Sequence, residues 1–350
     1  MEGDVAADMT IAGTRLKREA RLTGNRLDQT ETIWNSGAEM PANQLPAARA
    51  QLAAAKQREF QLRAPTGFPT PAEEIAAAKK DKRLGPLLAA YQKAIDDDPD
   101  SVAGYLGRAA FNIDIFEPRA ALPDLDEAIR REGDANSYLS RSGVYSQLGD
   151  FDKALADVDE ALALDPASED ALGWKTSVLS ELKRFDEALA IADEQLSLAK
   201  DKRGWTTTKS DLLGKAGRAE EGITLLAAAL ADRPGDSMLL NQMCWLKGTR
   251  SIQLDTALKD CTRAIELTDT PASVLDSRAM VFYRLGRLEE ARADLDAALK
   301  ISPDLPASLF LRAIVRLQGN DREGAQADLA LARLQHRRID AEYAGYGIAP

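Results

Sequence analysis

Residues 136–166 show the clearest pattern of apolar and polar positions in the chain. Small and apolar residues recur at helical spacing before and after Gly149, which interrupts the pattern. The positions that share a helix face are Tyr138, Ser142 and Tyr145 before the break, and Ala154, Val158 and Ala161 after it. Pro166 ends the second run, because proline cannot continue a helix. This stretch therefore predicts two short helices joined by a tight turn.

The same pattern returns along the chain at intervals of about 34 residues, which indicates an array of one repeated helix pair. Aligning the copies on the small residue of each second helix gives Ala94, Ala128, Ala161, Gln195, Ala229, Ala264, Ala298 and Ala332. First helices carry a matching small residue at Ala109, Ser142, Ser210, Ala279 and Ala313. Small side chains are needed where two helix backbones approach closely, so the pattern has a packing cause.

These recurring positions resemble the tetratricopeptide repeat family over roughly residues 70–335. The resemblance implies an all-α fold, a right-handed α-solenoid of about seven helix-turn-helix repeats. Two copies depart from the family pattern. Gln195 replaces the usual alanine, and Trp245 is expected to fill the small site of its first helix, which would splay that repeat or repack it locally.

The N-terminal part, residues 1–66, differs from the repeats. Residues 9–34 predict a small β-ribbon, a hairpin that turns at Gly24-Asn25. The alternative is a charged leader without fixed structure. A helix is expected to open at Pro46, since proline is favoured in the first turn of a helix.

The rest of the chain is expected to form two further parts. Residues 67–334 make the repeat array. Residues 335–350 make a capping helix and tail, because the end of a solenoid needs a cover. We expect this cap to cover Phe310 and Ile314.

Arginine on the first helix and aspartate on the second occur together in four copies. The pairs are Arg108 with Asp124, Arg141 with Asp157, Arg278 with Asp294, and Arg312 with Asp328. Copies with Lys175 or Lys209 in place of the arginine lack the aspartate. This co-occurrence predicts a structural ion pair between the two helices of a repeat, within hydrogen-bond distance. The alternative is a row of arginines that binds anions.

Composition excludes several classes of function. The formal net charge of −11 does not fit a nucleic-acid binder. No apolar run reaches the roughly 18 residues that a membrane-spanning helix needs. The opening residues, MEGDVAADM, lack the basic and apolar regions of a signal peptide. A cytoplasmic location is expected if Met1 is the native start.

The sequence contains no set of residues that fits catalysis. His336, the only histidine, is distant in sequence from Cys244 and Cys261, and a cysteine nucleophile needs a base within reach. The two cysteines lie on facing helices of one repeat, and we expect two small buried apolar residues. A disulfide is the alternative in an oxidising compartment. No metal site and no cofactor motif are found, so the chain is not expected to be an enzyme.

The resemblance implies that the inner, concave wall of the array is formed by the exposed faces of the first helices. Carried over position by position, the predicted peptide-binding residues are Leu139, Ser140, Gly143, Gly173, Trp174, Ser177, Thr207, Thr208, Asp211, Gln242, Met243, Leu246, Asp276, Met280 and Tyr283. Some family members hold the C-terminal carboxylate of heat-shock chaperones with Lys and Asn at these places, and this chain lacks that set. Small polar residues with Met and aromatics suit an extended or helical peptide instead.

The sequence thus predicts a non-catalytic scaffold that binds a protein or peptide ligand on its concave face. The tail RRIDAEYAGYGI and the stretch LNQMCWLKG also resemble the C-terminal part of exported bacterial transglutaminase-like proteins. That resemblance implies the alternative, an accessory region of a larger periplasmic or otherwise exported protein. A third interpretation is self-association through the N-terminal ribbon.

Overall fold

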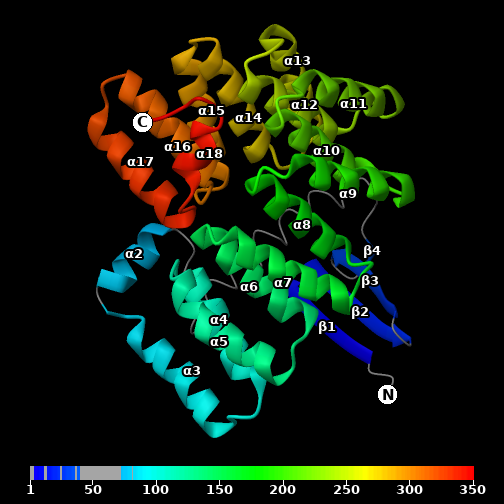
Figure 1. The fold of residues 1–350 in the computed structure, drawn as a ribbon, viewed down its shortest axis with the longest axis vertical. Helices are drawn as coiled ribbons and strands as arrows, with labels where there is room; N and C mark the ends of the chain where they lie inside the picture. Colours follow the sequence, from blue (N-terminus) through cyan, green and yellow to red (C-terminus); the bar gives the residue numbers. More distant parts are fainter. Residues whose placement is uncertain (1–3, 12–13, 24–25, 36–37, 40–71, 81) are drawn as a thin grey trace. The chain divides into compact units, whose positions relative to one another are not determined.

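The computed structural model describes residues 4–11, 14–23, 26–35, 38–39, 72–80 and 82–350. The chain divides into two compact units, Met1–Pro69 and Thr70–Pro350. Figure 1 shows both units, with strands in the first and helices in the second. No helix among the described residues is long and apolar enough to cross a membrane.

The first unit contains an antiparallel sheet of strand order β1-β2-β3-β4. The strands are β1 Asp4–Ile11, β2 Thr14–Thr23, β3 Arg26–Asn35 and β4 Ala38–Glu39. In the register of β2 and β3, Thr23 lies opposite Arg26. As an independently stable element, the ribbon of residues 9–34 stays a prediction, because a lone ribbon is marginal in water. The helix predicted from Pro46 lies outside the described residues.

The second unit is all helical. Its helices are α2 Ala72–Lys80, α3 Gly85–Asp97, α4 Val102–Asp114, α5 Pro118–Arg131, α6 Ala135–Leu148, α7 Phe151–Leu164, α8 Glu169–Glu181, α9 Phe185–Leu198, α10 Arg203–Lys215, α11 Ala219–Asp232, α12 Ser237–Arg250, α13 Leu254–Leu267, α14 Ala272–Arg284, α15 Leu288–Ile301, α16 Pro306–Gln318, α17 Arg322–Gln335 and α18 Ile339–Ala344. From α4 to α17, each even-numbered helix packs on the odd-numbered helix that follows it. Successive pairs also pack on one another, which makes the solenoid of about seven repeats that the sequence predicts.

The ends of the second unit meet. Helix α2 packs on α17 rather than pairing with α3 (Figure 1). Helix α3 instead packs on α4, in the place of the second helix of a preceding repeat. Helix α2 therefore belongs to a segment that bridges the start and the end of the array.

The small positions lie where the helices cross, as their spacing predicts. Ala154 and Ala161 of α7 and Ser142 of α6 are fully buried, and the Ser142 hydroxyl donates to the Ala154 carbonyl at 2.9 Å. Gly149 ends α6 in the left-handed conformation, with φ of 81°. Glycine adopts this conformation without the steric cost that a side chain adds, so the turn into α7 is tight.

The repeat formed by α12 and α13 corrects one prediction. The small site of α12 is filled by Cys244 rather than Trp245, and Cys244 is fully buried between α12 and α13. Cys244 forms a disulfide with Cys261, with a Cα–Cα distance of 5.3 Å. The expectation of two free cysteines is therefore wrong, as is that of a splayed repeat, because Trp245 lies one residue further round the helix.

Removing this disulfide is expected to lower the free energy of unfolding. The bond closes a loop with a sequence separation of 17 residues, and a loop of about this length gives about 3 kcal/mol. Urea unfolding with and without a thiol reductant measures the difference. The double variant Cys244→Ala/Cys261→Ala is the control, because reductant cannot affect it through this bond. An unchanged wild-type midpoint in reductant would contradict the prediction.

Candidate protein-binding surface

Each of the four predicted Arg–Asp pairs lies within hydrogen-bond distance. In every case the Nε and Nη2 groups of the arginine donate to the two carboxylate oxygens of the aspartate. The donor–acceptor distances are 2.8 and 2.6 Å for Arg108–Asp124, 2.9 and 2.6 Å for Arg141–Asp157, 2.6 and 2.8 Å for Arg278–Asp294, and 2.8 and 2.7 Å for Arg312–Asp328. These planar, two-point contacts fix the register of the two helices of a repeat.

The same cation positions also reach back to the preceding repeat, which the sequence analysis missed. These contacts are Arg108 to Gln92, Arg141 to Asp126, Lys175 to Asp159, Lys209 to Asp193, and Arg312 to Asp296. In three of the second helices, an Asp-x-Asp motif in the sequence marks these contacts between repeats, as in Asp157-Val158-Asp159. The first aspartate pairs within its repeat, and the second pairs with the next one.

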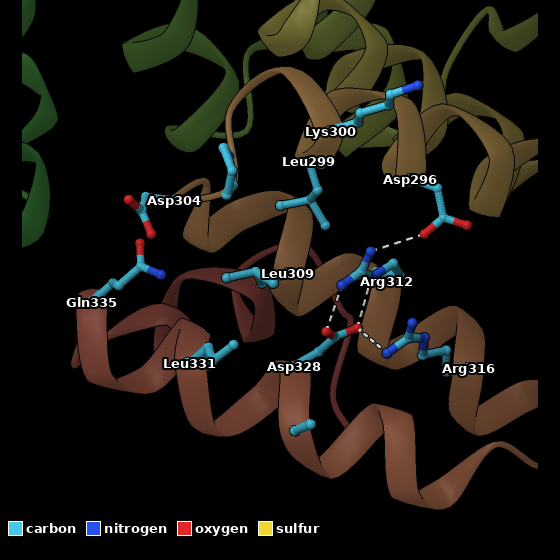
Figure 2. A pocket seen from close by; sticks show the side chains of 12 residues that line it. Asp296, Leu299, Lys300, Asp304, Leu309, Arg312, Arg316, Asp328, Leu331 and Gln335 are labelled. Atoms are coloured by element: carbon cyan, nitrogen blue, oxygen red, sulfur yellow. Dashed lines mark hydrogen bonds and ion pairs between the residues drawn. The ribbon is translucent and has the colours of Figure 1, made fainter. Parts of the chain in front are cut away.

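Figure 2 shows where this network lines a cavity of about 480 Å³ between α15, α16 and α17. The Arg312 guanidinium donates to Asp328 on one side and to Asp296 on the other. Arg316 lies 2.9 Å from the same Asp328 carboxylate. Because carboxylates of this chain already hold both arginines, the cavity does not fit the alternative of an anion-binding row.

A second cavity, of about 300 Å³, lies on the first helices α8, α10 and α12. It brings together residues that are far apart in sequence, and six of them belong to the predicted concave face. These six are Gly173, Ser177, Thr207, Thr208, Asp211 and Gln242. Thr176, Ser180, Leu212 and Lys215 complete its wall. We call this surface the polar groove.

The polar groove contains hydrogen-bonding groups without partners among the described residues. Ser180 is 7% exposed, and its hydroxyl has no partner. The Nε2 amide of Gln242 is buried without an acceptor, and so is Oδ1 of the adjacent Asn241 without a donor. A buried polar group without a partner costs free energy. A ligand that these side chains can reach by rotating towards the cavity would recover that free energy.

Trp174 forms an exposed apolar surface beside the polar groove. Its side chain is 40% exposed, and its ring lies over Gly143 of α6, where a Cβ atom would be 3.5 Å from the ring. The neighbouring Leu139 is half-buried, and Ser140 is exposed. The predicted residues on α6 and α8 are thus accessible.

Four predicted residues are buried, which corrects their assignment. Met243 and Leu246 pack in the apolar cluster between α11 and α12. The cause is that Cys244, and not Trp245, occupies the small site of α12. One residue turns a helix by about 100°, so the positions of α12 that are equivalent to Leu139, Ser140 and Gly143 are Asn241, Gln242 and Trp245.

Asp276 and Met280 are buried for a different reason, since the C-terminal tail covers α14. The Asp276 carboxylate accepts a hydrogen bond from the Ser308 hydroxyl at 2.5 Å, and burial raises its pKa to about 6. Tyr283 is half-buried, and its hydroxyl accepts a hydrogen bond from the Gln318 amide at 3.4 Å. Asp276 and Met280 therefore do not face an open groove.

The tail, residues 336–350, lies against the first helices α12, α14 and α16. Ile339, Tyr343 and Ile348 are almost fully buried, as are Phe310 and Ile314 beneath them. The rings of Tyr343 and Phe310 are 4.6 Å apart, and those of Tyr346 and Trp245 are 5.7 Å apart. The cover expected over Phe310 and Ile314 is therefore present in the structure.

The residues just before α18 also reach the early repeats. Arg337 donates to the Phe116 carbonyl at 2.9 Å. Arg338 donates to Glu181 at 2.9 Å and lies over the Phe151 ring. The predicted residues that lie away from the tail and stay accessible are those of α6, α8 and α10, together with Gln242 of α12.

Comparisons with known proteins agree with this architecture. Two family models, both described as tetratricopeptide repeat, match residues 145–212 and residues 272–305. Yeast Tom70 has a similar structure, with a TM-score of 0.57 and 18% sequence identity over 89% of this chain and 76% of that one. A tetratricopeptide repeat protein from Parabacteroides merdae gives a TM-score of 0.48 and 15% identity, over 71% of this chain and 99% of that one. A search of curated proteins found no match.

The repeats, their small crossing positions and the family matches together define the class. The chain contains tetratricopeptide repeats, which the family models match over residues 145–212 and 272–305. At this identity, the likeness to Tom70 shows the fold alone. None of these matches points to a transglutaminase-like protein.

Proposed function

We propose that this protein is a non-catalytic scaffold that binds an extended peptide segment of a partner protein in the polar groove. The observation that carries this proposal is the set of unpartnered groups on Ser180, Asn241 and Gln242 in and beside an open cavity. An extended peptide has backbone N–H and C=O groups without internal partners, whereas a helix satisfies its own. Serine, threonine and glutamine side chains pair well with such a backbone.

Trp174 supports the same proposal, because it supplies the apolar anchor that a polar groove lacks. Tryptophan is enriched among the residues that dominate binding energy at protein interfaces. Its 40% exposure leaves apolar surface for a ligand to bury. A peptide that crosses α8 and α10 would contact both Trp174 and the Thr207–Thr208 pair.

The proposal predicts a specific loss of affinity in two variants. Peptides that the full-length protein selects from a random displayed library are synthesised and titrated against it. Trp174→Ala is expected to weaken binding about tenfold or more, because a hot-spot residue contributes about 2 kcal/mol. Thr208→Val keeps the side-chain shape and removes the hydroxyl, so we expect a loss of about fivefold.

The matched control is Thr262→Val on α13, whose hydroxyl is exposed and donates to the Leu258 carbonyl of its own helix. Selected peptides should bind this variant as they bind the wild type. If Trp174→Ala and Thr208→Val also keep wild-type affinity, the ligand does not bind in the polar groove and the proposal fails.

The remaining predictions are proposals of the same kind. We take residues 67–334 as the binding array and residues 335–350 as its cap. The Cys244–Cys261 disulfide favours an oxidising compartment, and this fits an exported protein. No observation favours a transglutaminase-like whole protein. Self-association through the N-terminal ribbon would appear as concentration-dependent sedimentation.

A further inference from the structure

A third cavity, of about 510 Å³, lies at the C-terminal end of α10 and the turn into α11. It shares Lys215 with the polar groove, so the two cavities are neighbours. Its charged lining consists of Lys215, Arg218, Glu220, Glu221 and Arg250. We call it the side cavity, because it opens beside the polar groove at the ends of the helices.

Four of these five charged groups already have partners. Arg218 pairs with Glu221 at 2.7 Å, and Glu220 accepts a hydrogen bond from Gln253 at 3.2 Å. Lys215 pairs with Asp211 of the polar groove at 3.0 Å. Glu221 is thus paired with a cation and Glu220 with a neutral amide, and Arg250 is the charged group of the lining that lacks a hydrogen-bond or ion-pair partner among the described residues.

Arg250 has no carboxylate partner among the described residues. Its Nε group is buried and has no acceptor. Its guanidinium lies over the Tyr346 ring, with 5.4 Å from Cζ to the ring centroid. A cation–π contact of this kind attracts the guanidinium without using its N–H groups as hydrogen-bond donors. Arg250 is thus held in place with donors that nothing in the described chain accepts.

A second arginine adds to the positive charge at this place. Arg284 of α14 donates to the carbonyls of Thr249 and Tyr346 and has no carboxylate partner among the described residues either. Burial and the charge of Arg250 lower the pKa of Arg284. Two arginines close together without an acid are unusual in a chain with a net charge of −11.

We propose that Arg250 forms a carboxylate-binding subsite, which takes an aspartate or glutamate side chain of the peptide bound in the polar groove. This inference rests on the proposed function and specifies its ligand. A guanidinium matches a carboxylate with two parallel hydrogen bonds. Because the side cavity opens beside the groove, a side chain of a peptide that continues along the groove reaches it more readily than a chain end.

The test uses the full-length protein and blocked peptides of defined charge. The probes are acetylated and amidated hexaglutamate, hexaserine and hexalysine, none of which has a charged terminus. The Nε–Hε signal of Arg250 is followed by NMR, and affinity is followed by fluorescence anisotropy. Hexaglutamate is expected to shift the Arg250 signal saturably, and hexaserine and hexalysine are not.

Arg250→Gln removes the charge and is expected to weaken hexaglutamate binding at least about tenfold, since a charge-assisted pair contributes about 1.5–3 kcal/mol. Arg263→Gln is the matched control, because Arg263 is exposed on α13 and pairs only with its helix neighbour Glu266 in the described contacts. The control should bind like the wild type. Equal affinity in Arg250→Gln, or an Arg250 signal that hexaglutamate leaves unchanged, overturns the subsite.

The two proposals fail separately. If circular dichroism shows that the Arg250→Gln variant is unfolded, the NMR titration of the wild type alone decides whether the subsite exists. If Trp174→Ala loses its library-selected peptides while hexaglutamate ignores Arg250, the groove stands and the subsite falls. If hexaglutamate binds at Arg250 but library peptides are indifferent to Trp174→Ala and Thr208→Val, the carboxylate site exists without the proposed groove.

Discussion

Replacing Tyr343 by alanine is expected to lower the free energy of unfolding of the C-terminal repeats by about 3–5 kcal/mol, the usual cost of truncating a buried aromatic side chain. Tyr343 is fully buried under the tail, and its ring packs on both Phe310 and Tyr346. Truncation leaves a cavity between α16 and α18 that the surrounding apolar residues cannot refill. Urea unfolding followed by tryptophan fluorescence measures the change, because Trp245 contacts the same tail.

The control for this variant is Tyr343→Phe. It keeps the ring and removes only the hydroxyl, which donates to the Ala307 carbonyl at 3.0 Å. The expected cost is about 1 kcal/mol. If Tyr343→Ala costs no more than Tyr343→Phe, the tail does not stabilise the array, and the concave faces of α14 and α16 are open to a ligand after all.

Replacing Asp157 by asparagine is the second change with a large expected effect, about 3 kcal/mol of unfolding free energy. The Asp157 side chain is only 6% exposed, and it accepts both hydrogen bonds from Arg141. Removing the buried carboxylate leaves Arg141 with only the more exposed Asp126 of the preceding repeat as a charged partner, and this loss is the main cost. Urea unfolding at constant salt concentration measures it.

Asp159→Asn, two residues further along α7, is the matched control. Asp159 pairs with Lys175 of the next repeat, but its side chain is 51% exposed. An exposed pair contributes at most about 1 kcal/mol, since water and salt screen it. Equal losses for the two variants would mean that the pairs within repeats do not fix the helix register.

The repeats were predictable because their signal recurs at one spacing. The same reasoning found the Arg141–Asp157 type of pair, since the two residues change together between copies. The contacts between repeats follow from Asp159 and its equivalents, and the Asp-x-Asp motif would have revealed them. The sequence also indicated that the tail covers Phe310, because apolar residues of the tail match the exposed end of an apolar array.

The errors have a definite physical cause. The step from Ser210 to Ala279 spans two repeats and is one residue longer than two steps of 34. The extra residue falls between Cys244 and Ala257, where α12 turns into α13. Placing Trp245 at the small site moves each predicted binding position of α12 one residue too far along the chain. Buried residues were therefore predicted to bind the peptide. The sequence left the disulfide open as an alternative, and it did not indicate the unpartnered groups of Ser180 and Gln242, because both features depend on distances between side chains of different helices.

The central claim is that a peptide binds along α8 and α10 on the concave face. Site-specific photo-cross-linking tests it most directly, with p-benzoylphenylalanine placed at Ser177 on α8 or at Glu160 on α7. Both side chains are exposed, but only Ser177 lines the polar groove. The account predicts that a library-selected peptide cross-links at position 177 and not at position 160. Cross-linking at position 160 alone, or equally at both positions, would contradict it.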